Sequence, residues 1–355
     1  MHFGICVMAN IDEIDFFAHA ENLGYDSVWV TDSQMIFSDC YAVLALAAQR
    51  TQRLRLGTGT SICGTRIPPV HVAAMATLNK LAPGRVHMGI GTGNTAMRAM
   101  GQRPMRLADY DEYLGVLAAL LRGEVVDYRY RDRVRAIKML TDNKKYLSLE
   151  PKIPLYVSGF GPKAMELAGK HGDGLIFAIP PRGVPVREAL EHAATGARRA
   201  GRRLPTDFKN CALTNVALLG KGEATDSPRV VRTVGPNVMA SVYYFYDEVH
   251  ERGIDPPEFL RPIWKRYCAL VEQTRPEHRH FRTHELHYTD LHPGEAELID
   301  ANLIRATCLV GMPEQVVEQV RELGRQGLEE LMFAIGVDDK RQIAQTFAEQ
   351  VIARV

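Results

Sequence analysis

The chain has 355 residues, of which 46% are hydrophobic and 24% are charged. These values are typical of folded domains and exclude disorder over most of the chain. Its 43 basic and 42 acidic residues leave a net charge of +1, so no overall positive field exists to hold nucleic acid or an acidic membrane. No apolar run approaches the ~18 residues that cross a bilayer, and the N-terminal segment lacks the basic start of a secretion signal. We therefore expect a soluble, cytoplasmic protein.

The distribution of the cysteines also favours a cytoplasmic location. They are scattered without a CxxC pair, and most of them lie in apolar runs, so we expect buried free thiols in a reducing cytoplasm. They are Cys6, Cys40, Cys63, Cys211, Cys268 and Cys308.

Short apolar runs alternate along the chain with segments whose apolar residues recur at helical spacing. The runs predict strands over residues 2–8, 27–30, 54–61, 85–91, 153–158, 174–178, 211–219 and 330–335. The helical segments are 10–23, 42–51, 69–81, 107–121, 162–171, 186–200 and 313–326, and an amphipathic helix closes the chain.

Eight strands separated by helices predict a parallel sheet. An open, doubly wound sheet and a closed (β/α)8 barrel both fit this alternation. No polar linker divides the chain after four strands, which favours one (β/α)8 TIM barrel domain over residues 1–355. Such a barrel needs ~250 residues, so about 100 belong to insertions. These fall at 124–151 and 221–302, and the second is long enough to be an active-site lid.

In a barrel of this kind, function resides where the strands end at their C-terminal edge. The residues at this rim are small, polar and rich in glycine, and few are charged, which suits a large planar ligand better than a metal ion. They are Met8, Ala9, Asn10, Thr31, Asp32, Ser33, Gly59, Thr60, Ser61, Thr92, Gly93, Asn94, Ser158, Gly159, Phe160, Gly161, Ala178, Ile179, Gly336, Val337 and Asp338.

Two glycine-rich runs on this rim are candidate phosphate sites. In Ser158-Gly159-Phe160-Gly161-Pro162, glycines allow backbone amides to approach an anion, and the proline starts a helix whose N-terminus attracts one. An ordinary turn between strand and helix is the alternative. The run from Gly89 to Asn94 lacks the third glycine of a dinucleotide fingerprint and is more typical of a tight turn.

A cluster of histidines in the second insertion raises the possibility of a metal site. It comprises His278, His280, His284, His287 and His292. The segment lacks HExxH, and its spacings do not place three ligands on one helical face. Because arginines are interleaved with the histidines, we expect a surface segment and no metal.

Four segments together resemble the bacterial-luciferase-like superfamily of flavin- and deazaflavin-dependent oxidoreductases, and most closely its methylenetetrahydromethanopterin-reductase-like branch. They occur in the family's order and are AENLGYDSVWVTDS, RLRLGTGTSICGTRIPPVHVAAMATLNKLAPGRVHMGIGTGN, IPLYVSGFGPKAMELAGKHGDG and LVGMPEQVVEQVRELGRQGLEEL.

The resemblance implies a TIM barrel whose flavin or deazaflavin ring lies at the C-terminal ends of the strands. Gly59-Thr60 matches the family's non-proline cis peptide behind the ring, and residues 158–161 match its phosphate loop. Thr92, Gly93 and Asn94 match the segment beside the ring and the substrate. With Met8 and Asp32, these residues form the expected cofactor site.

Two departures from the family affect the expected chemistry. The family often has Asp-His or Glu-His after the second strand, whereas this chain has Asp32-Ser33. The sugar-phosphate dehydrogenase branch has Glu where this chain has Asn94, which forms hydrogen bonds but cannot titrate. We expect Asp32, Ser33 and Asn94 to be the catalytic residues, and sugar-phosphate oxidation is disfavoured.

Two mechanisms fit such a rim. In the favoured one, a separate NAD(P)H-flavin reductase supplies reduced FMN, which reacts with O2 to oxygenate a small organic substrate while the protein positions and desolvates it. In the alternative, coenzyme F420 exchanges hydride with an organic substrate, and Asp32 is the nearest acid or base. A non-catalytic or flavin-storage barrel is a third possibility.

The sequence also predicts a homodimer and a lid helix. The helices after strands two and three carry more small apolar residues than one barrel wall needs, and we expect them to form the interface. These residues are Ala42, Val43, Leu44, Leu46, Ala47, Val72, Ala73, Ala74 and Met75. Within the second insertion, Val238, Val242, Phe245 and Val249 predict a helix over 237–253, with Tyr243, Tyr244 and Tyr246 divided between the core and the active-site mouth.

Overall fold

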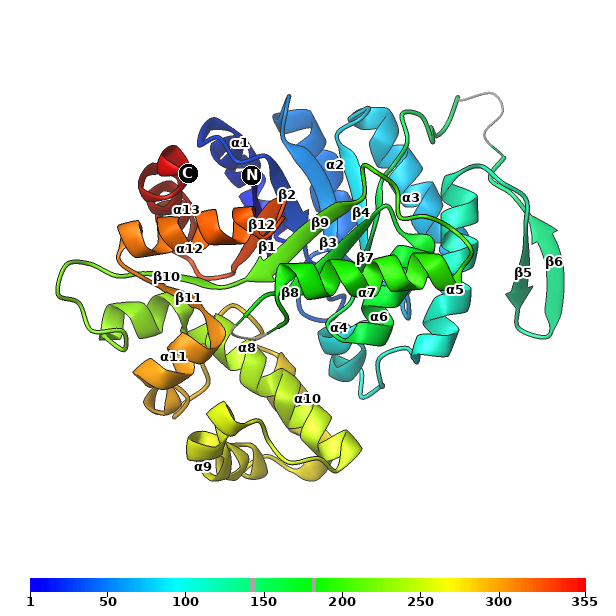
Figure 1. The fold of residues 1–355 in the computed structure, drawn as a ribbon. Coiled ribbons are helices and arrows are strands. Elements are labelled where there is room, and N and C mark those ends of the chain that lie inside the picture. The colour runs from blue at the N-terminus through cyan, green and yellow to red at the C-terminus, as the bar shows by residue number, and fades with distance from the viewer. Residues whose placement is uncertain (141–144, 181–182) are drawn as a thin grey trace.

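The computed structural model describes residues 1–140, 145–180 and 183–355. Eight parallel strands form a closed barrel in the order β1-β12-β9-β8-β7-β4-β3-β2 (Figure 1). This confirms the predicted TIM barrel. Its strands are β1 (His2–Val7), β2 (Ser27–Val30), β3 (Arg55–Ile62), β4 (Val86–Gly91), β7 (Leu155–Ser158), β8 (Gly174–Ala178), β9 (Lys209–Thr214) and β12 (Glu330–Ile335).

Helices cover the outside of the barrel. They are α1 (Asp15–Asn22), α2 (Cys40–Arg50), α3 (Pro68–Leu81), α5 (Leu107–Leu121), α6 (Pro162–His171), α7 (Val186–Arg199), α12 (Pro313–Arg325) and α13 (Lys340–Gln350), with the short α4 (Asn94–Ala99) directly after β4. Helix α2 begins two residues earlier than predicted because the Asp39 side chain caps it, accepting hydrogen bonds from the N–H groups of Tyr41 and Ala42.

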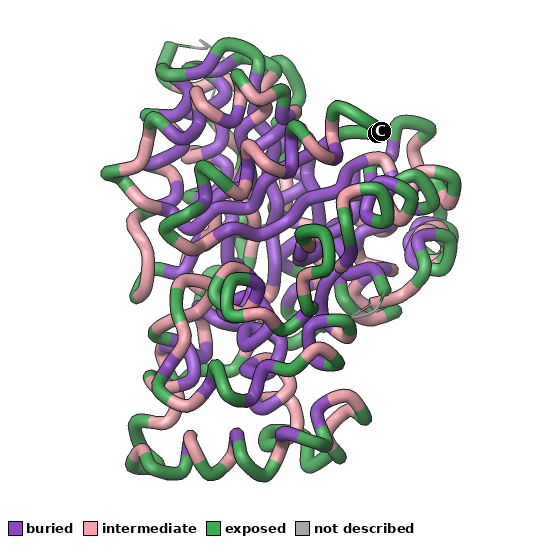
Figure 2. The backbone as a smooth tube through the Cα atoms, turned by 90° about the vertical axis from the view of Figure 1, so that its left-hand side faces the viewer, coloured by how far each residue is buried: buried purple, intermediate pink, exposed green. Residues whose placement is uncertain are grey.

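The strands are buried on both faces, as Figure 2 shows by the continuous buried trace through the barrel. Alternate side chains of each strand point outward against the helices or inward. The inward-facing set packs as a separate cluster inside the barrel. Its buried members are Cys6, Met8, Trp29, Tyr156, Ile176, Cys211, Met332 and Ala334.

The first insertion contains an antiparallel hairpin of β5 (Val126–Tyr130) and β6 (Arg133–Ile137). It projects from the barrel beside α5 (Figure 1). Residues 141–144 of this insertion lie outside the described residues.

The second insertion differs from the prediction at its start. The strand expected over 211–219 divides at Asn215, and β10 (Val216–Leu218) leaves the barrel to pair with β11 (Leu309–Gly311). The cause lies in Asn215, which is buried and donates a hydrogen bond from its side-chain amide to the Thr307 carbonyl. The excursion from the barrel therefore begins directly after β9.

Four helices build the rest of this insertion, namely α8 (Pro228–Arg252), α9 (Arg261–Glu272), α10 (Arg279–His284) and α11 (Ala301–Thr307). Helix α8 contains the predicted helix but begins nine residues earlier, with Pro236 inside it. Helices α8, α9 and α11 share a hydrophobic core that includes Val238, Val242, Tyr243 and Tyr267. In Figure 1 they form a group on one side of the barrel.

The expectation of a surface histidine segment is wrong for part of the cluster. His278 is exposed, but His284 and His292 are buried. For His284 the reason is that α10 packs against α4 and faces Asp247 of α8 rather than solvent. Within the described residues, no group of His, Cys, Asp or Glu side chains is arranged to hold a metal ion.

The cysteines are free, and all but the half-buried Cys268 are buried. Among the described residues, none of the helices combines the length and the apolar character needed to span a membrane.

The expected dimer surface needs a correction. Val43, Leu44, Ala47, Val72 and Met75 are buried in the core of the chain itself. Of the residues named from the sequence, Leu46 is exposed, and the other large apolar side chains that these two helices expose are Val70 and Leu81.

Candidate active site at the barrel mouth

The ends of β3, β4 and β7 bring three of the expected cofactor residues together. The Gly59–Thr60 peptide bond is cis, as expected, and the β3–β4 register shifts between Thr58 and Ser61. A Cβ atom on Gly91 would lie 2.8 Å from Thr60 Oγ1 and 3.6 Å from Ser158 Cβ. Thr60 and Ser158 therefore face each other across Gly91 at the mouth of the barrel.

The glycine-rich loop after β7 divides into two functionally different parts. The Gly159 N–H donates to the Ile176 carbonyl at 2.9 Å, and a Cβ atom there would lie 2.7 Å from the α6 backbone. Gly159 is therefore a packing residue whose amide is already used. Gly161 has no neighbouring heavy atom within 4 Å of a Cβ position.

The free donors at this loop lie one residue further along. Pro162 starts α6, and in the part of the chain that the structure describes no hydrogen bond is formed by the backbone N–H groups of Lys163 or Ala164. Unpaired N–H groups at a helix N-terminus attract an anion. Phe160, beside them, is 48% exposed.

Asp32, at the end of β2, is buried and forms an ion pair with Arg66. Arg66 Nη1 lies 2.6 Å from Asp32 Oδ2, and Arg66 Nη2 lies 2.9 Å from Asp39 Oδ2. Burial raises the pKa of Asp32 above its usual 3.8, and the Arg66 guanidinium opposes that rise. The carboxyl is thus a titratable group held in one orientation.

Two other expected rim residues lie close to Asp32 in the chain or in space. Ser33 is buried, and its carbonyl accepts hydrogen bonds from the N–H groups of Ile36 and Phe37 in the turn after β2. Met8, at the end of β1, lies beside Thr31, whose hydroxyl is 3.9 Å from the Met8 sulfur.

The segment after β4 turns sharply into α4. Gly93 has φ of 89°, a left-handed conformation that glycine adopts without steric cost. Asn94 then starts α4, and its Oδ1 accepts a hydrogen bond of 2.9 Å from Arg98 Nε. The expected catalytic Asn94 therefore has its acceptor atom occupied and its amide N–H2 left as the donor end.

Arg98 connects this segment to the insertion. It is 4% exposed and pairs with Glu248 at 3.1 Å, with Asp247 at 3.5 Å and with Glu251, all on α8. A buried arginine held by several carboxylates fixes the orientation of the groups it contacts. The insertion and Asn94 are thus joined through one side chain.

The insertion also contacts the rim directly. Asn237 Nδ2 on α8 donates to the carbonyl of Ala334 in β12 at 2.7 Å. In the turn after α10, His287 Nε2 lies 3.0 Å from Thr95 Oγ1 on α4. Tyr288 follows it and packs against the cluster inside the barrel.

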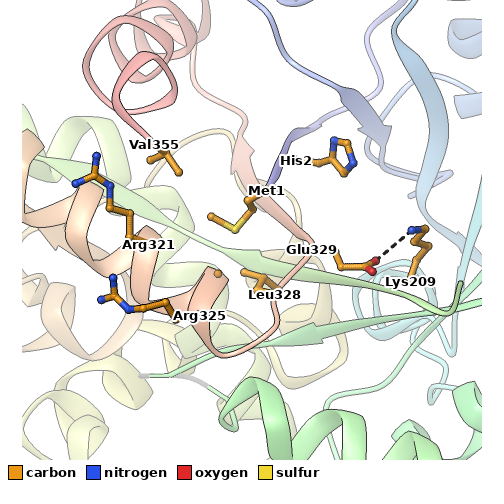
Figure 3. Close-up of a pocket in the computed structure, with 9 residues that line it drawn as sticks. Met1, His2, Lys209, Arg321, Arg325, Leu328, Glu329 and Val355 are labelled. Atoms are coloured by element: carbon orange, nitrogen blue, oxygen red, sulfur yellow. Dashed lines mark ion pairs between the residues drawn. The ribbon is translucent and has the colours of Figure 1, made fainter. Parts of the chain in front are cut away.

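A separate pocket of about 630 Å³ lies at the opposite end of the barrel (Figure 3). His2 and Lys209 begin β1 and β9, so this pocket is at the N-terminal end of the strands. Lys209 Nζ and Glu329 Oε2 form an ion pair there at 3.7 Å. Because barrel chemistry occurs at the C-terminal end, this pocket is not the candidate site.

Five residues of the site were not assigned to it from the sequence. They are Arg66, Thr95, Arg98, His287 and Tyr288. Arg66 follows β3 within the segment that carries the family resemblance, so its position on the rim was the available signal. The other four have no local signal, because α4 and the turn after α10 are 192 residues apart in the chain.

The closed parallel barrel, with a glycine-rich mouth and an adjoining helical insertion, places the chain in the class of (β/α)8 barrel proteins. Within it, the chain belongs to the luciferase-like monooxygenase family, whose model matches residues 2–330. It is therefore an oxidoreductase.

The relatives found by sequence comparison include methylenetetrahydromethanopterin reductases. The one from Archaeoglobus fulgidus is 25% identical over the full length of both chains. The one from Methanolobus tindarius is 33% identical over 188 residues, and this match spans 52% of this chain and 54% of the relative. An F420-dependent glucose-6-phosphate dehydrogenase from Amycolatopsis mediterranei is 24% identical over 97% of this chain and 94% of its own.

Solved structures share the fold. The coenzyme F420 dependent tetrahydromethanopterin reductase from Methanopyrus kandleri superposes with a TM-score of 0.68 at 21% identity, over 99% of this chain and 98% of its own. The oxygenating constituent of 3,6-diketocamphane monooxygenase from Pseudomonas putida, in complex with FMN, has a TM-score of 0.60 at 16% identity, covering 100% and 99%.

Proposed function

We propose that the chain is an F420-dependent oxidoreductase that transfers hydride between the deazaflavin and a small organic substrate. The observation that carries this proposal is the match to relatives along essentially the whole chain, since they include a methylenetetrahydromethanopterin reductase and an F420-dependent dehydrogenase. The monooxygenase in complex with FMN supports only a shared fold. We therefore adopt the alternative expectation in place of the FMN monooxygenase.

The residues at the mouth fit such a cofactor. A Cβ atom on Gly91 would crowd Thr60 Oγ1 and lie near Ser158, so glycine lets the ends of β3, β4 and β7 approach closely, and we assign the flat ring to the face of the Gly59–Thr60 peptide. The N–H groups of Lys163 and Ala164, beside the open space at Gly161, fit a phosphate. F420, when bound, supplies the hydride donor or acceptor.

Asp32 is the residue that we assign to proton transfer. Its raised pKa allows it to take up and release a proton closer to neutrality than an exposed aspartate does. The ion pair with Arg66 holds one carboxylate oxygen, Oδ2, and orients the group. We assign to Asn94 a hydrogen bond from its amide N–H2 to the substrate, since Arg98 already bonds to its oxygen.

Parallel fluorescence titrations of the purified protein with F420 and with oxidised and reduced FMN test this proposal. We expect F420 to bind with a dissociation constant at least about tenfold lower than either form of FMN, equivalent to about 1.4 kcal/mol. If reduced FMN binds more tightly than F420, the FMN-dependent monooxygenase becomes the better hypothesis. An Asp32→Asn variant should retain the F420 affinity, since the assigned role of Asp32 is in proton transfer.

A further inference from the structure

Tyr288 of the insertion has an unusual backbone conformation. It lies in the turn after α10 with φ of 67°, in the left-handed region that bulky side chains avoid. Among the described residues other than glycine, only Arg131 also has a positive φ. Arg131 is exposed in the turn of the β5–β6 hairpin, where this conformation is common. Tyr288 is instead held in it by tertiary contacts, which is typical of functional sites.

The contacts of Tyr288 place it at the mouth of the barrel. A Cβ atom on Gly336, which follows β12, would collide with the Tyr288 carbonyl and would lie 3.2 Å from Met8 Cγ. The Tyr288 side chain packs against the cluster inside the barrel, as do Phe37 and Leu213. The second insertion thus places one aromatic side chain among the rim residues of several strands.

His287 fixes the turn that carries Tyr288. The two rings meet edge to face with centroids 4.6 Å apart, and His287 Nε2 bonds to Thr95 beside Asn94. Burial lowers the pKa of His287 to about 3, so the imidazole is neutral at physiological pH and makes a neutral hydrogen bond. His287 therefore ties Tyr288 to the segment that starts at Asn94.

We propose that Tyr288 is a specificity-determining residue that forms a wall of the substrate pocket over the cofactor and limits the size of the molecules that reach it. His287 acts as its positioning residue. Tyr288, Phe37 and Leu213 all pack against the apolar cluster inside the barrel, of which Met8 is a member, so the pocket takes a compact substrate with an apolar body. This inference rests on the proposed function in placing the cofactor ring at the barrel mouth.

Collisional quenching of the fluorescence of bound F420 tests this role. The two quenchers are both neutral and differ in size: acrylamide and the bulkier nitroxide TEMPOL. In the parent protein we expect acrylamide to quench weakly and TEMPOL hardly at all. Tyr288→Ala should raise both quenching constants severalfold and remove the discrimination by size, whereas Tyr288→Phe should behave as the parent.

Control variants separate this role from general loosening of the fold. Arg131→Ala makes the same change at the other left-handed residue and should leave both constants unchanged. Tyr288→Asn also removes the ring, but asparagine tolerates the left-handed conformation. This variant replaces Tyr288→Ala in the quenching experiment if Tyr288→Ala does not fold. His287→Phe should admit TEMPOL at an unchanged melting temperature, and His287→Gln, which can still bond to Thr95, should restore its exclusion.

The outcomes distinguish this inference from the proposed function. Unchanged quenching in folded Tyr288→Ala and Tyr288→Asn with F420 bound would overturn the role of Tyr288 and leave the proposed function intact. If the parent does not bind F420, the same quenching is measured with FMN, which tests Tyr288 while the proposed cofactor is rejected. Failure of both cofactors to bind would overturn the two proposals together.

Discussion

At the scale of single residues, the site depends on a few side chains whose usual properties are altered by burial. Asp32 is 3% exposed and faces Arg66. Removing that cation leaves a buried carboxylate without compensation, which costs more than the pair itself contributes. Substitutions at this ion pair and at the loop that we assign to phosphate therefore test the site.

Arg66→Met should reduce stability in a pH-dependent way. Without the arginine, the pKa of Asp32 rises further above its usual 3.8, so the native state retains a proton that the unfolded chain releases. The free energy of unfolding then falls as pH rises from 3.8 toward the native pKa. We expect a loss of about 2 kcal/mol at pH 7, between the values for exposed and buried pairs, and a smaller loss near pH 4.

Urea unfolding at both pH values measures this difference. Arg106→Met is the matched control, because Arg106 pairs with Asp109 on the exposed surface. It should show no such dependence on pH. Equal losses for Arg66→Met at the two pH values would show that Asp32 does not titrate as described.

The glycine-rich loop gives a second residue-scale prediction. Gly161→Val places a side chain in open space beside the free amides of α6, so we expect weaker F420 binding and an unchanged melting temperature. Gly159→Val should instead lower the melting temperature, because its side chain would collide with the α6 backbone. Equal F420 affinity in the parent and Gly161→Val would remove the phosphate from this loop.

At the scale of elements, the barrel strands were predictable because each is a short apolar run between helical patterns. The exception is β9, where the apolar run continues through β10. Only the tertiary contacts of Asn215 with α8 and α11 explain the break. The prediction of a surface histidine segment was wrong for a related reason, since α10 packs against α4 and α8. The cis peptide and the glycine-rich loop after β7, by contrast, consist of local residues that match a known family.

Arg98 is the main polar connection between α4 and α8. Arg98→Met leaves the carboxylates of Asp247, Glu248 and Glu251 without their shared cation, and we expect a loss of about 3 kcal/mol in the free energy of unfolding. Hydrogen exchange should accelerate in the C-terminal half of α8 while β3 and β4 keep their protection. Uniform acceleration across the barrel would mean that Arg98 supports the whole fold rather than this connection.

The proposed lid is tested by hydrogen exchange on the parent. If the insertion covers the ring, F420 binding should slow exchange in α8 and in the turn after α10, because closing elements order over a bound ligand. Protection confined to the ends of the barrel strands would make the insertion an outer decoration.

In the whole molecule, α2 and α3 remain our predicted dimer interface, through Leu46, which the sequence suggested, and Val70, which it did not. Leu46 is 41% and Val70 47% exposed. We expect sedimentation to give a homodimer, and Leu46→Glu or Val70→Glu to convert it to the 39.6 kDa monomer, since a charge in an apolar interface is costly. A parent protein that sediments as a monomer at micromolar concentration would rule the dimer out.

A crystal structure of the complex with F420 would show whether the cofactor lies at the C-terminal mouth of the barrel, as we propose. We predict electron density for the ring against Gly59–Thr60 and beneath Tyr288, with a phosphate at the N–H groups of Lys163 and Ala164. F420 density in the pocket lined by His2 and Lys209 at the opposite end of the barrel, with an empty mouth, would contradict this account.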